Sequence, residues 1–230
     1  MTRGGTSGAC AVAALLLAAS PLALACGRPT AAPADAPLRV ATYSDPLSFD
    51  PHFFNEFLTF STLGNLYESL VEFDAQLRVQ PALAASWENP NDHTWRFHLR
   101  DGVRFHDGST LGAADVVASL QRVRSHPRSA FGNYLVMVEE VRALDGRTVE
   151  ITTAQPFPLL LNKLCFIRIL PAAAPAEVTH PVGTGPYLLD AHEPGKRLAL
   201  RAFSRYWRGR APEERVELLV VPDPGERVAA

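Results

Sequence analysis

The chain has 230 residues, of which 47% are hydrophobic and 20% are charged. These proportions are typical of a globular protein with a sizeable core, and they exclude disordered and collagen-like chains. The 22 basic and 24 acidic residues leave a formal net charge of −2, so no overall positive field is present to hold a nucleic acid. We therefore expect no nucleic-acid partner.

Residues 1–25 have the layout of a secretory signal peptide. Arg3 is their only charged residue, an apolar run follows it, and small residues precede Cys26. The run is too short for a comfortable membrane span. The segment ending in Cys26 resembles a bacterial lipoprotein processing site, although Ala23 stands where that pattern usually has leucine. We expect a periplasmic or extracytoplasmic protein, with Cys26 as a candidate lipid anchor to the membrane and residues 26–37 as a flexible tether.

The cysteine count excludes a disulfide scaffold. If Cys26 carries lipid, Cys165 has no partner in the mature chain. Leu164 and Phe166 flank Cys165 with apolar surface. This setting predicts a buried, inert thiol in place of a nucleophile.

The first half of the mature chain predicts strands and a helix. Residues 38–43 are rich in β-branched and aromatic side chains and meet turn formers, which predicts a strand. Apolar residues recur at helical spacing and predict a helix over 59–71. Residues 94–99 alternate between apolar and polar, which predicts a half-buried strand.

The second half predicts a mixed α/β protein with hairpins. Apolar spacing indicates a helix over 113–124, which Asp115 stabilises in its first turn. Asp145-Gly146 predicts a tight hairpin between 136–144 and 147–153. Further expected elements are a helix over 158–164 and strands over 166–170, 186–189, 198–202 and 216–221.

No motif of catalysis or cofactor binding is present in the sequence. Gly183-Thr184-Gly185 begins like a dinucleotide loop, but the third glycine is missing and Pro186 lacks a backbone donor. Phosphate-loop and esterase-elbow motifs are absent as well. His93, His98 and His106 have no metal-ligand spacing and are expected on the solvated surface. We expect no enzyme activity, no cofactor and no metal.

His52 stands in a loop crowded with phenylalanines. Aromatic side chains around a few polar groups suit a small-molecule pocket, and they equally suit a domain core. We expect most of these aromatic residues in the core and one or two in a pocket wall.

Seven motifs, in shared order and spacing, resemble the bacterial family 5 extracellular solute-binding proteins of the peptide, dipeptide and nickel type. These proteins deliver ligands to ABC importers. The motifs are Leu47-Ser48-Phe49-Asp50-Pro51-His52, Leu66-Tyr67-Glu68-Ser69-Leu70-Val71, 81–88, 97–108, Ala114-Asp115-Val116-Val117, 183–187 and Tyr206-Trp207-Arg208-Gly209.

The resemblance implies an α/β lobe of the type II periplasmic-binding-protein kind, with a mixed sheet, hairpins and flanking helices. It implies that residues 38–230 are the first lobe of a hinged clamp roughly twice this size, with the second lobe absent. Within this lobe we expect residues 38–50 and about 181–230 to form one subdomain, and about 51–180 to form the other. Because relatives draw much of their ligand recognition from the second lobe, we expect this chain to bind weakly at most.

The resemblance also implies a function and a site. The expected function is capture of a peptide or similar small solute by a monomer, for delivery to ABC permease subunits. An exported sensing or scaffolding module without transport is the alternative, ahead of an exported hydrolase, for which no activated nucleophile is evident. The ligand-binding residues implied are Tyr43, Ser44, His52, Asn55, Phe131, Phe166, Gly183, Thr184 and Gly185.

Overall fold

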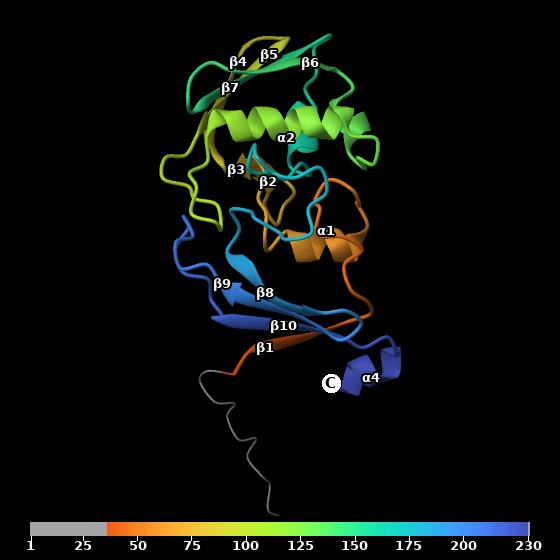
Figure 1. Ribbon diagram of the computed structural model, residues 1–230. Helices are drawn as coiled ribbons and strands as arrows, with labels where there is room; N and C mark the ends of the chain where they lie inside the picture. The colour runs from red at the N-terminus through yellow and green to blue at the C-terminus, as the bar shows by residue number, and fades with distance from the viewer. Residues whose placement is uncertain (1–35, 230) are drawn as a thin grey trace, which may run out of the picture. The chain divides into compact units, whose positions relative to one another are not determined.

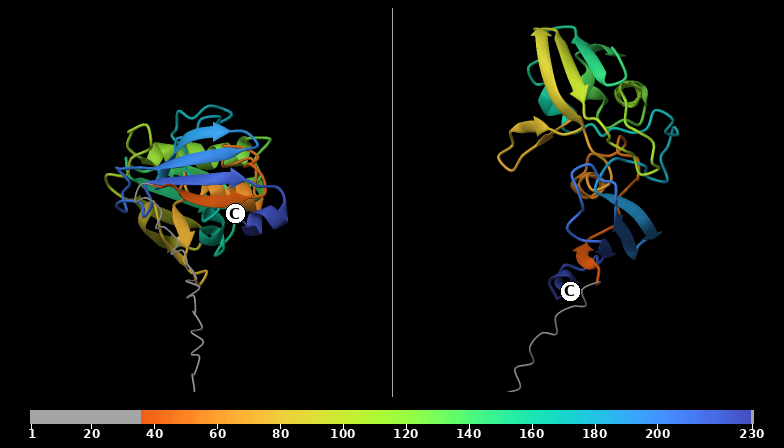
Figure 2. Two further views of the ribbon diagram at one scale, coloured as in Figure 1. Left: turned by 90° about the horizontal axis from the view of Figure 1, so that it is seen from below. Right: turned by 90° about the vertical axis from the view of Figure 1, so that its left-hand side faces the viewer.

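The first and last strands of the described part of the chain lie side by side in one four-stranded sheet. The computed structural model describes residues 36–229, so the predicted signal peptide, Cys26 and most of the tether lie outside the described residues. The sheet has the order β1-β10-β9-β8, in which β1 runs parallel to β10 and the other neighbours are antiparallel (Figure 2, left). Its strands are β1 (Leu38–Thr42), β8 (Tyr187–Glu193), β9 (Arg197–Ala202) and β10 (Arg215–Val220).

A second, antiparallel sheet lies in the middle of the sequence. It has the order β4-β5-β7-β6, and the helix α2 (Ala113–Ser125) packs against β6 and β7 (Figure 1). A two-stranded ribbon joins β2 to β3. The strands are β2 (Val71–Phe73), β3 (Val79–Pro81), β4 (Ala84–Asn91), β5 (Thr94–Leu99), β6 (Val138–Ala143) and β7 (Thr148–Thr153). The short helices are α1 (Phe57–Leu63), the 3-10 helix η1 (Gly132–Leu135), α3 (Leu160–Leu164) and α4 (Pro224–Ala229).

Two hydrophobic clusters hold these elements together. The larger one joins the β4-β5-β7-β6 sheet to α2 and includes Phe97, Leu120 and Ile151, each 0% exposed. The smaller one lies against the other sheet and includes Tyr67 and Leu198. Burying one large apolar side chain contributes about 1.5–3 kcal/mol. The predicted division into two subdomains stays a prediction.

Several predicted elements are confirmed. The strand expected over 94–99 is β5, and its apolar residues face the core as the alternation predicted. The helix expected over 113–124 is α2, and the Asp115 carboxylate accepts a 2.8 Å hydrogen bond from the Gly112 amide at its start. The hairpin around Asp145-Gly146 is formed by β6 and β7.

Two predicted elements are wrong, and long-range hydrogen bonds explain both. The helix expected over 59–71 ends at Leu63, because the carbonyls beyond it are taken by distant amides: Gly185 donates to Leu66 over 3.0 Å and Ile169 donates to Glu68 over 2.9 Å. The strand expected over 166–170 forms only a single bridge, between Ser69 and Arg168. Among residues 36–229, no helix is long and apolar enough to cross a membrane.

Candidate functional site

Four of the predicted site residues keep some exposed surface, and three of them lie between β1 and α1. Tyr43 follows the end of β1 and is 51% exposed. Ser44 is half-buried beside it, and Asn55 is exposed just before α1. Leu47 lies on the loop between them and donates a 2.8 Å backbone hydrogen bond to the Thr59 hydroxyl, which fastens this loop to α1.

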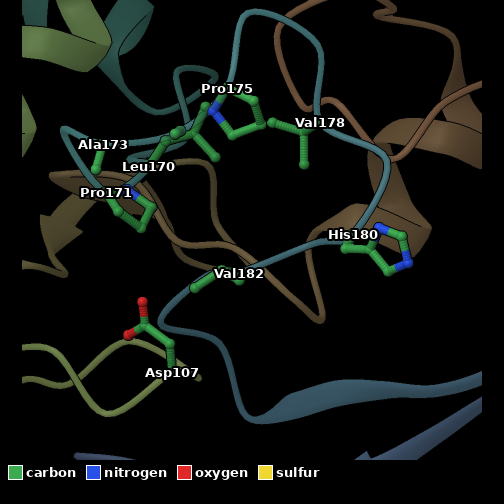
Figure 3. Close-up of a pocket in the computed structure, with 9 residues that line it drawn as sticks. Asp107, Leu170, Pro171, Ala173, Pro175, Val178, His180 and Val182 are labelled. Carbon is green, nitrogen blue, oxygen red and sulfur yellow. The ribbon is translucent and has the colours of Figure 1, made fainter.

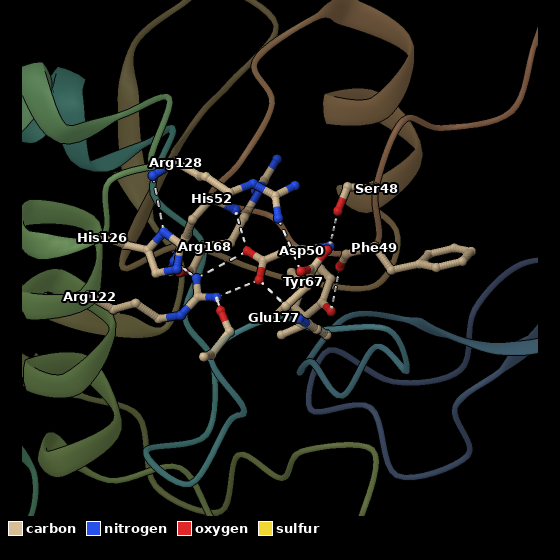
Figure 4. A network of polar contacts seen from close by, with 12 residues as sticks. Ser48, Phe49, Asp50, His52, Tyr67, Arg122, His126, Arg128, Arg168 and Glu177 are labelled. Atoms are coloured by element: carbon tan, nitrogen blue, oxygen red, sulfur yellow. Dashed lines mark hydrogen bonds and ion pairs between the residues drawn. The ribbon is translucent and has the colours of Figure 1, made fainter.

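His52, in contrast, lies inside the protein as part of a polar network (Figure 4). Arg122 extends from α2 and donates to both carboxylate oxygens of Asp50, one of them at 3.0 Å, and to His52 Nδ1 at 2.8 Å. Since Nδ1 accepts, His52 carries its proton on Nε2, which donates to the Arg168 carbonyl over 2.8 Å. The structure therefore corrects the expectation for His52: it links internal segments and presents no surface to a ligand.

Burial also determines the charge of this network. Removal from water lowers the pKa of His52 to about 4, and the nearby Arg122 lowers it as well. The imidazole is therefore neutral near pH 7. The Asp50 carboxylate remains paired with Arg122 and also accepts a 3.1 Å hydrogen bond from the Val178 amide. The network thus joins the loop at 50–52 to α2 and to the loop before Val178.

Gly183 and Gly185 are glycines because another backbone lies against them. A Cβ on Gly183 would stand 2.0 Å from the Leu66 carbonyl oxygen, and one on Gly185 would stand 2.5 Å from the Asn65 carbonyl oxygen. Two backbone segments of the same protein therefore approach here, where a ligand was expected to approach. The expectation that these glycines lie next to a ligand is corrected accordingly.

Thr184, between them, is fully buried and bound to Glu68. Its hydroxyl donates to Glu68 Oε2 over 2.8 Å, and Trp207 Nε1 donates to the same oxygen over 2.8 Å. The Tyr206 hydroxyl donates to Glu68 Oε1. Burial raises the pKa of Glu68, although these three donors act in the opposite direction. Thr184 thus has a structural role, and Glu68 is the residue that connects two of the sequence motifs.

Phe131 and Phe166 belong to a cluster of aromatic rings. Phe131 is fully buried and is corrected from a ligand contact to a core residue. Phe166 is half-buried and lies 5.8 Å from Phe60 and 5.7 Å from Tyr134, measured between ring centroids. Phe60 and Tyr134 are also only partly buried, so this side of the cluster offers an accessible aromatic surface.

A separate hollow of about 150 Å³ lies beside the loop at 170–182 (Figure 3). Its wall is mostly apolar, and Asp107 and His180 are the ionisable residues that line it. Small-molecule sites usually measure about 300–1,000 Å³. The hollow is therefore too small to hold a peptide by itself.

Residues 36–229 contain no group of three or more His, Cys, Asp or Glu side chains arranged to hold a metal ion. Cys165 is buried and burial raises its pKa to about 11, so it stays a protonated thiol near pH 7. His106 Nε2 donates to the Gly185 carbonyl over 3.0 Å, and its Nδ1 accepts from the Gly183 amide over 3.2 Å, so this side chain helps to fix the 183–185 loop.

Sequence reasoning missed Arg122, Glu68 and Arg168 as organisers of this region. Glu68 lies in one of the quoted motifs, but nothing in the sequence indicated its partners. Arg122 is on the expected helix, but the helical spacing gave no indication of its partners.

The fold is that of part of a type II periplasmic-binding protein. AgaA from A. tumefaciens R10, solved with agropinic acid, superposes with a TM-score of 0.79 and 27% identity, over 85% of this chain and 42% of that one. MoaA from the same source, solved with mannopinic acid, gives 0.77 and 28%, over 85% and 43%. NikA from Brucella suis, solved with Fe(III)-EDTA, gives 0.77 and 25%, over 85% and 41%.

Sequence comparison gives the family. The profile of the bacterial extracellular solute-binding proteins, family 5, matches residues 78–230, and the chain belongs to this family. It is 34% identical over 188 residues to the glutathione-binding protein GsiB of Pectobacterium atrosepticum. It is 33% identical over 184 residues to GsiB of Escherichia coli O157:H7. Each match covers 76% of this chain and 36% of the relative, so the chain spans about a third of the length of these curated relatives.

Proposed function

We propose that the protein is the solute-binding component of an ABC importer and captures a peptide or similar small solute for a membrane permease. The observation that carries this proposal is the family match over residues 78–230 together with the similarity to GsiB. Similar structures hold small organic acids, namely agropinic acid and mannopinic acid, which supports a small polar solute for this chain too.

The proposed ligand contacts are the accessible members of the predicted set. Tyr43 offers a half-exposed ring, Ser44 and Asn55 offer hydrogen-bonding groups, and Phe166 offers a partly buried ring. A ring can stack on apolar parts of a solute, while hydroxyl and amide groups fix its orientation. The hydrogen bonds between Arg122 and Asp50 hold the loop that carries Tyr43, Ser44 and Asn55.

The mechanism is capture and release, with no bond made or broken. A ligand changes the conformation of a binding protein only when it binds one state more tightly than the other. We propose that solute-dependent closure creates the surface that the permease recognises. We propose in addition that export by residues 1–25, and lipid attachment at Cys26, place the monomeric protein outside the cytoplasm.

The test is solute binding by the purified chain, measured at millimolar concentrations because we expect weak binding. Glutathione, a dipeptide and mannopinic acid are added separately, and the thermal unfolding midpoint is recorded. A solute at 100 times its dissociation constant stabilises the folded state by about 2.7 kcal/mol. We expect at least one of these solutes to raise the midpoint in a saturable way. If none does so, and none is detected by calorimetry, the proposed function is wrong.

A further inference from the structure

Two cations rest on the accessible aromatic surface. The guanidinium of Arg168 lies 4.7 Å from the centre of the Phe60 ring, and the ammonium of Lys163 lies 4.6 Å from the centre of the Tyr134 ring. Phe166 touches both of these rings, so one continuous line of ring contacts joins the two cations. We call Arg168, Lys163, Phe60, Tyr134 and Phe166 the cation–aromatic surface.

Neither cation is neutralised within the part of the chain that the structure describes. Arg168 donates to the Ser69 hydroxyl over 3.2 Å, a neutral partner, and its Nε is buried without any hydrogen bond. No ion pair involves Arg168 or Lys163 among residues 36–229. Arg168 is only partly buried, but its Nε is out of contact with water, and a guanidinium held in this way without an ion-pair partner is costly.

The acidic groups near Arg168 are engaged elsewhere. Glu72 accepts a 2.7 Å hydrogen bond from Arg208, and Glu68 accepts from Thr184, Tyr206 and Trp207. Both carboxylates raise the pKa of Arg168, yet burial outweighs them and lowers it to about 10. The guanidinium is still charged near pH 7, so the site keeps a positive charge that internal groups do not satisfy.

We propose that the positive charges of Arg168 and Lys163 select solutes that carry a carboxylate group, while the rings beside these cations hold the solute's apolar part. This inference rests on the proposed function and narrows the solute to organic acids. A guanidinium suits a carboxylate because its planar N–H groups match the two carboxylate oxygens. Lys163 adds a second positive charge beside the same line of rings.

The experiment compares an acid with its neutral analogue on the full chain. N-acetylphenylalanine and N-acetylphenylalanine amide share the ring and the backbone and differ in the charge of one group. Their dissociation constants are measured by ligand-observed NMR for the unchanged chain and for Lys163→Gln, Arg168→Gln and Lys196→Gln. Lys196 lies on the exposed turn between β8 and β9 and serves as the control lysine.

We expect the acid to bind at least tenfold more tightly than the amide. We also expect Lys163→Gln and Arg168→Gln each to remove most of that preference, with Lys196→Gln unchanged. Equal binding of acid and amide, unchanged preference in both variants, or no binding of either probe would overturn the proposal. Should Arg168→Gln fail to fold, Lys163→Gln still decides, because Lys163 is half-buried on the short helix α3.

A second measurement uses the scarcity of lysine in this chain. Lys163 and Lys196 are its two lysines. Limited amine acetylation followed by mass spectrometry therefore reports on each of them directly. We expect N-acetylphenylalanine to protect Lys163 and not Lys196, and equal modification of Lys163 with and without the acid would contradict the proposal. If a neutral solute binds without any effect of the two variants, the carboxylate site is wrong and the importer function stands.

Discussion

The Tyr206 hydroxyl and the Glu68 carboxylate, 138 positions apart in the sequence, are joined by a 2.8 Å hydrogen bond. Trp207 and Thr184 donate to the same carboxylate, so one buried acid connects three distant segments. Each of these donors would be left without a partner if the acceptor were lost. The stability of the fold therefore depends on Glu68 more than on any exposed ion pair.

Replacing Glu68 with glutamine tests this dependence. Glutamine keeps one carbonyl oxygen and replaces the other with an NH₂ group, which faces donors it cannot satisfy. We expect a loss of about 2–4 kcal/mol in the free energy of unfolding, measured by urea denaturation. Glu72→Gln is the matched control, because Glu72 is 39% exposed and pairs with Arg208 near the surface. Its cost should stay below about 1 kcal/mol. Equal losses for the two variants would contradict the assignment.

His52 predicts a pH dependence of stability. Its pKa is lowered to about 4 in the folded protein from 6.5, so between these values the unfolded chain binds the proton and the folded chain does not. Stability is then fully present above pH 6.5 and falls as the pH drops towards 4. At about 1.36 kcal/mol per pKa unit, this contribution is at most roughly 3 kcal/mol.

The His52 contribution is isolated by comparing slopes. The raised pKa of Glu68 acts in the opposite sense, since the folded state holds its proton more tightly and gains stability as the pH falls. The free energy of unfolding of the unchanged chain and of His52→Asn is measured from pH 7 to pH 4. We expect a smaller loss on acidification in the variant. Parallel curves would show that His52 does not titrate as described.

Gly183 predicts a steric requirement. A methyl group there would stand 2.0 Å from the Leu66 carbonyl oxygen, which neither backbone can avoid without moving. We expect Gly183→Ala to cost at least about 3 kcal/mol or to prevent folding, measured by thermal and urea unfolding. In Gly146→Ala the new methyl group meets no atom within 4 Å, and the change should stay within about 0.5 kcal/mol. A mild effect of Gly183→Ala would mean that residues 183–185 and 65–66 are less close than the structure places them.

Tyr43 predicts a change in binding without a change in folding. Its ring is 51% exposed, so Tyr43→Ala removes little packing. We expect the dissociation constant of the bound solute to rise roughly tenfold, because one aromatic contact is lost. The far-UV spectrum and the unfolding midpoint should be unchanged. Val136→Ala, at a position 75% exposed, is the control and should leave affinity unaltered.

Local periodicity accounts for the elements that sequence reasoning predicted well. Trp95, Phe97 and Leu99 alternate with polar residues, and this alternation predicts a strand with one face against the core. The path of the loops at the candidate site, in contrast, depends on long-range hydrogen bonds. The segment after Leu63 has helical spacing of apolar residues, yet amides from more than a hundred positions away determine its path.

The same contrast between local pattern and long-range contact applies to the predicted site residues. Exposure of Tyr43 and Asn55 follows from their place in a loop, as expected. The burial of His52 does not follow from its place in a loop, because it results from pairing with Arg122, 70 positions further on. The close contact of Gly183 with Leu66 is not predictable from any local sequence pattern either. Identity of motif residues was therefore informative about the family and much less about which of them face a solute.

The pairing of β1 with β10 has a consequence for synthesis and export of the chain. Leu38 meets Val216 across this pair, and within residues 36–229 β10 is the only strand beside β1. Until the residues near 216 have left the ribosome, β1 has unpaired backbone N–H and C=O groups along both of its edges. An unpaired strand of this kind readily pairs with strands of other chains. A fragment ending before Arg215 should therefore aggregate, and the nascent polypeptide would need a chaperone to shield its front end for most of translation.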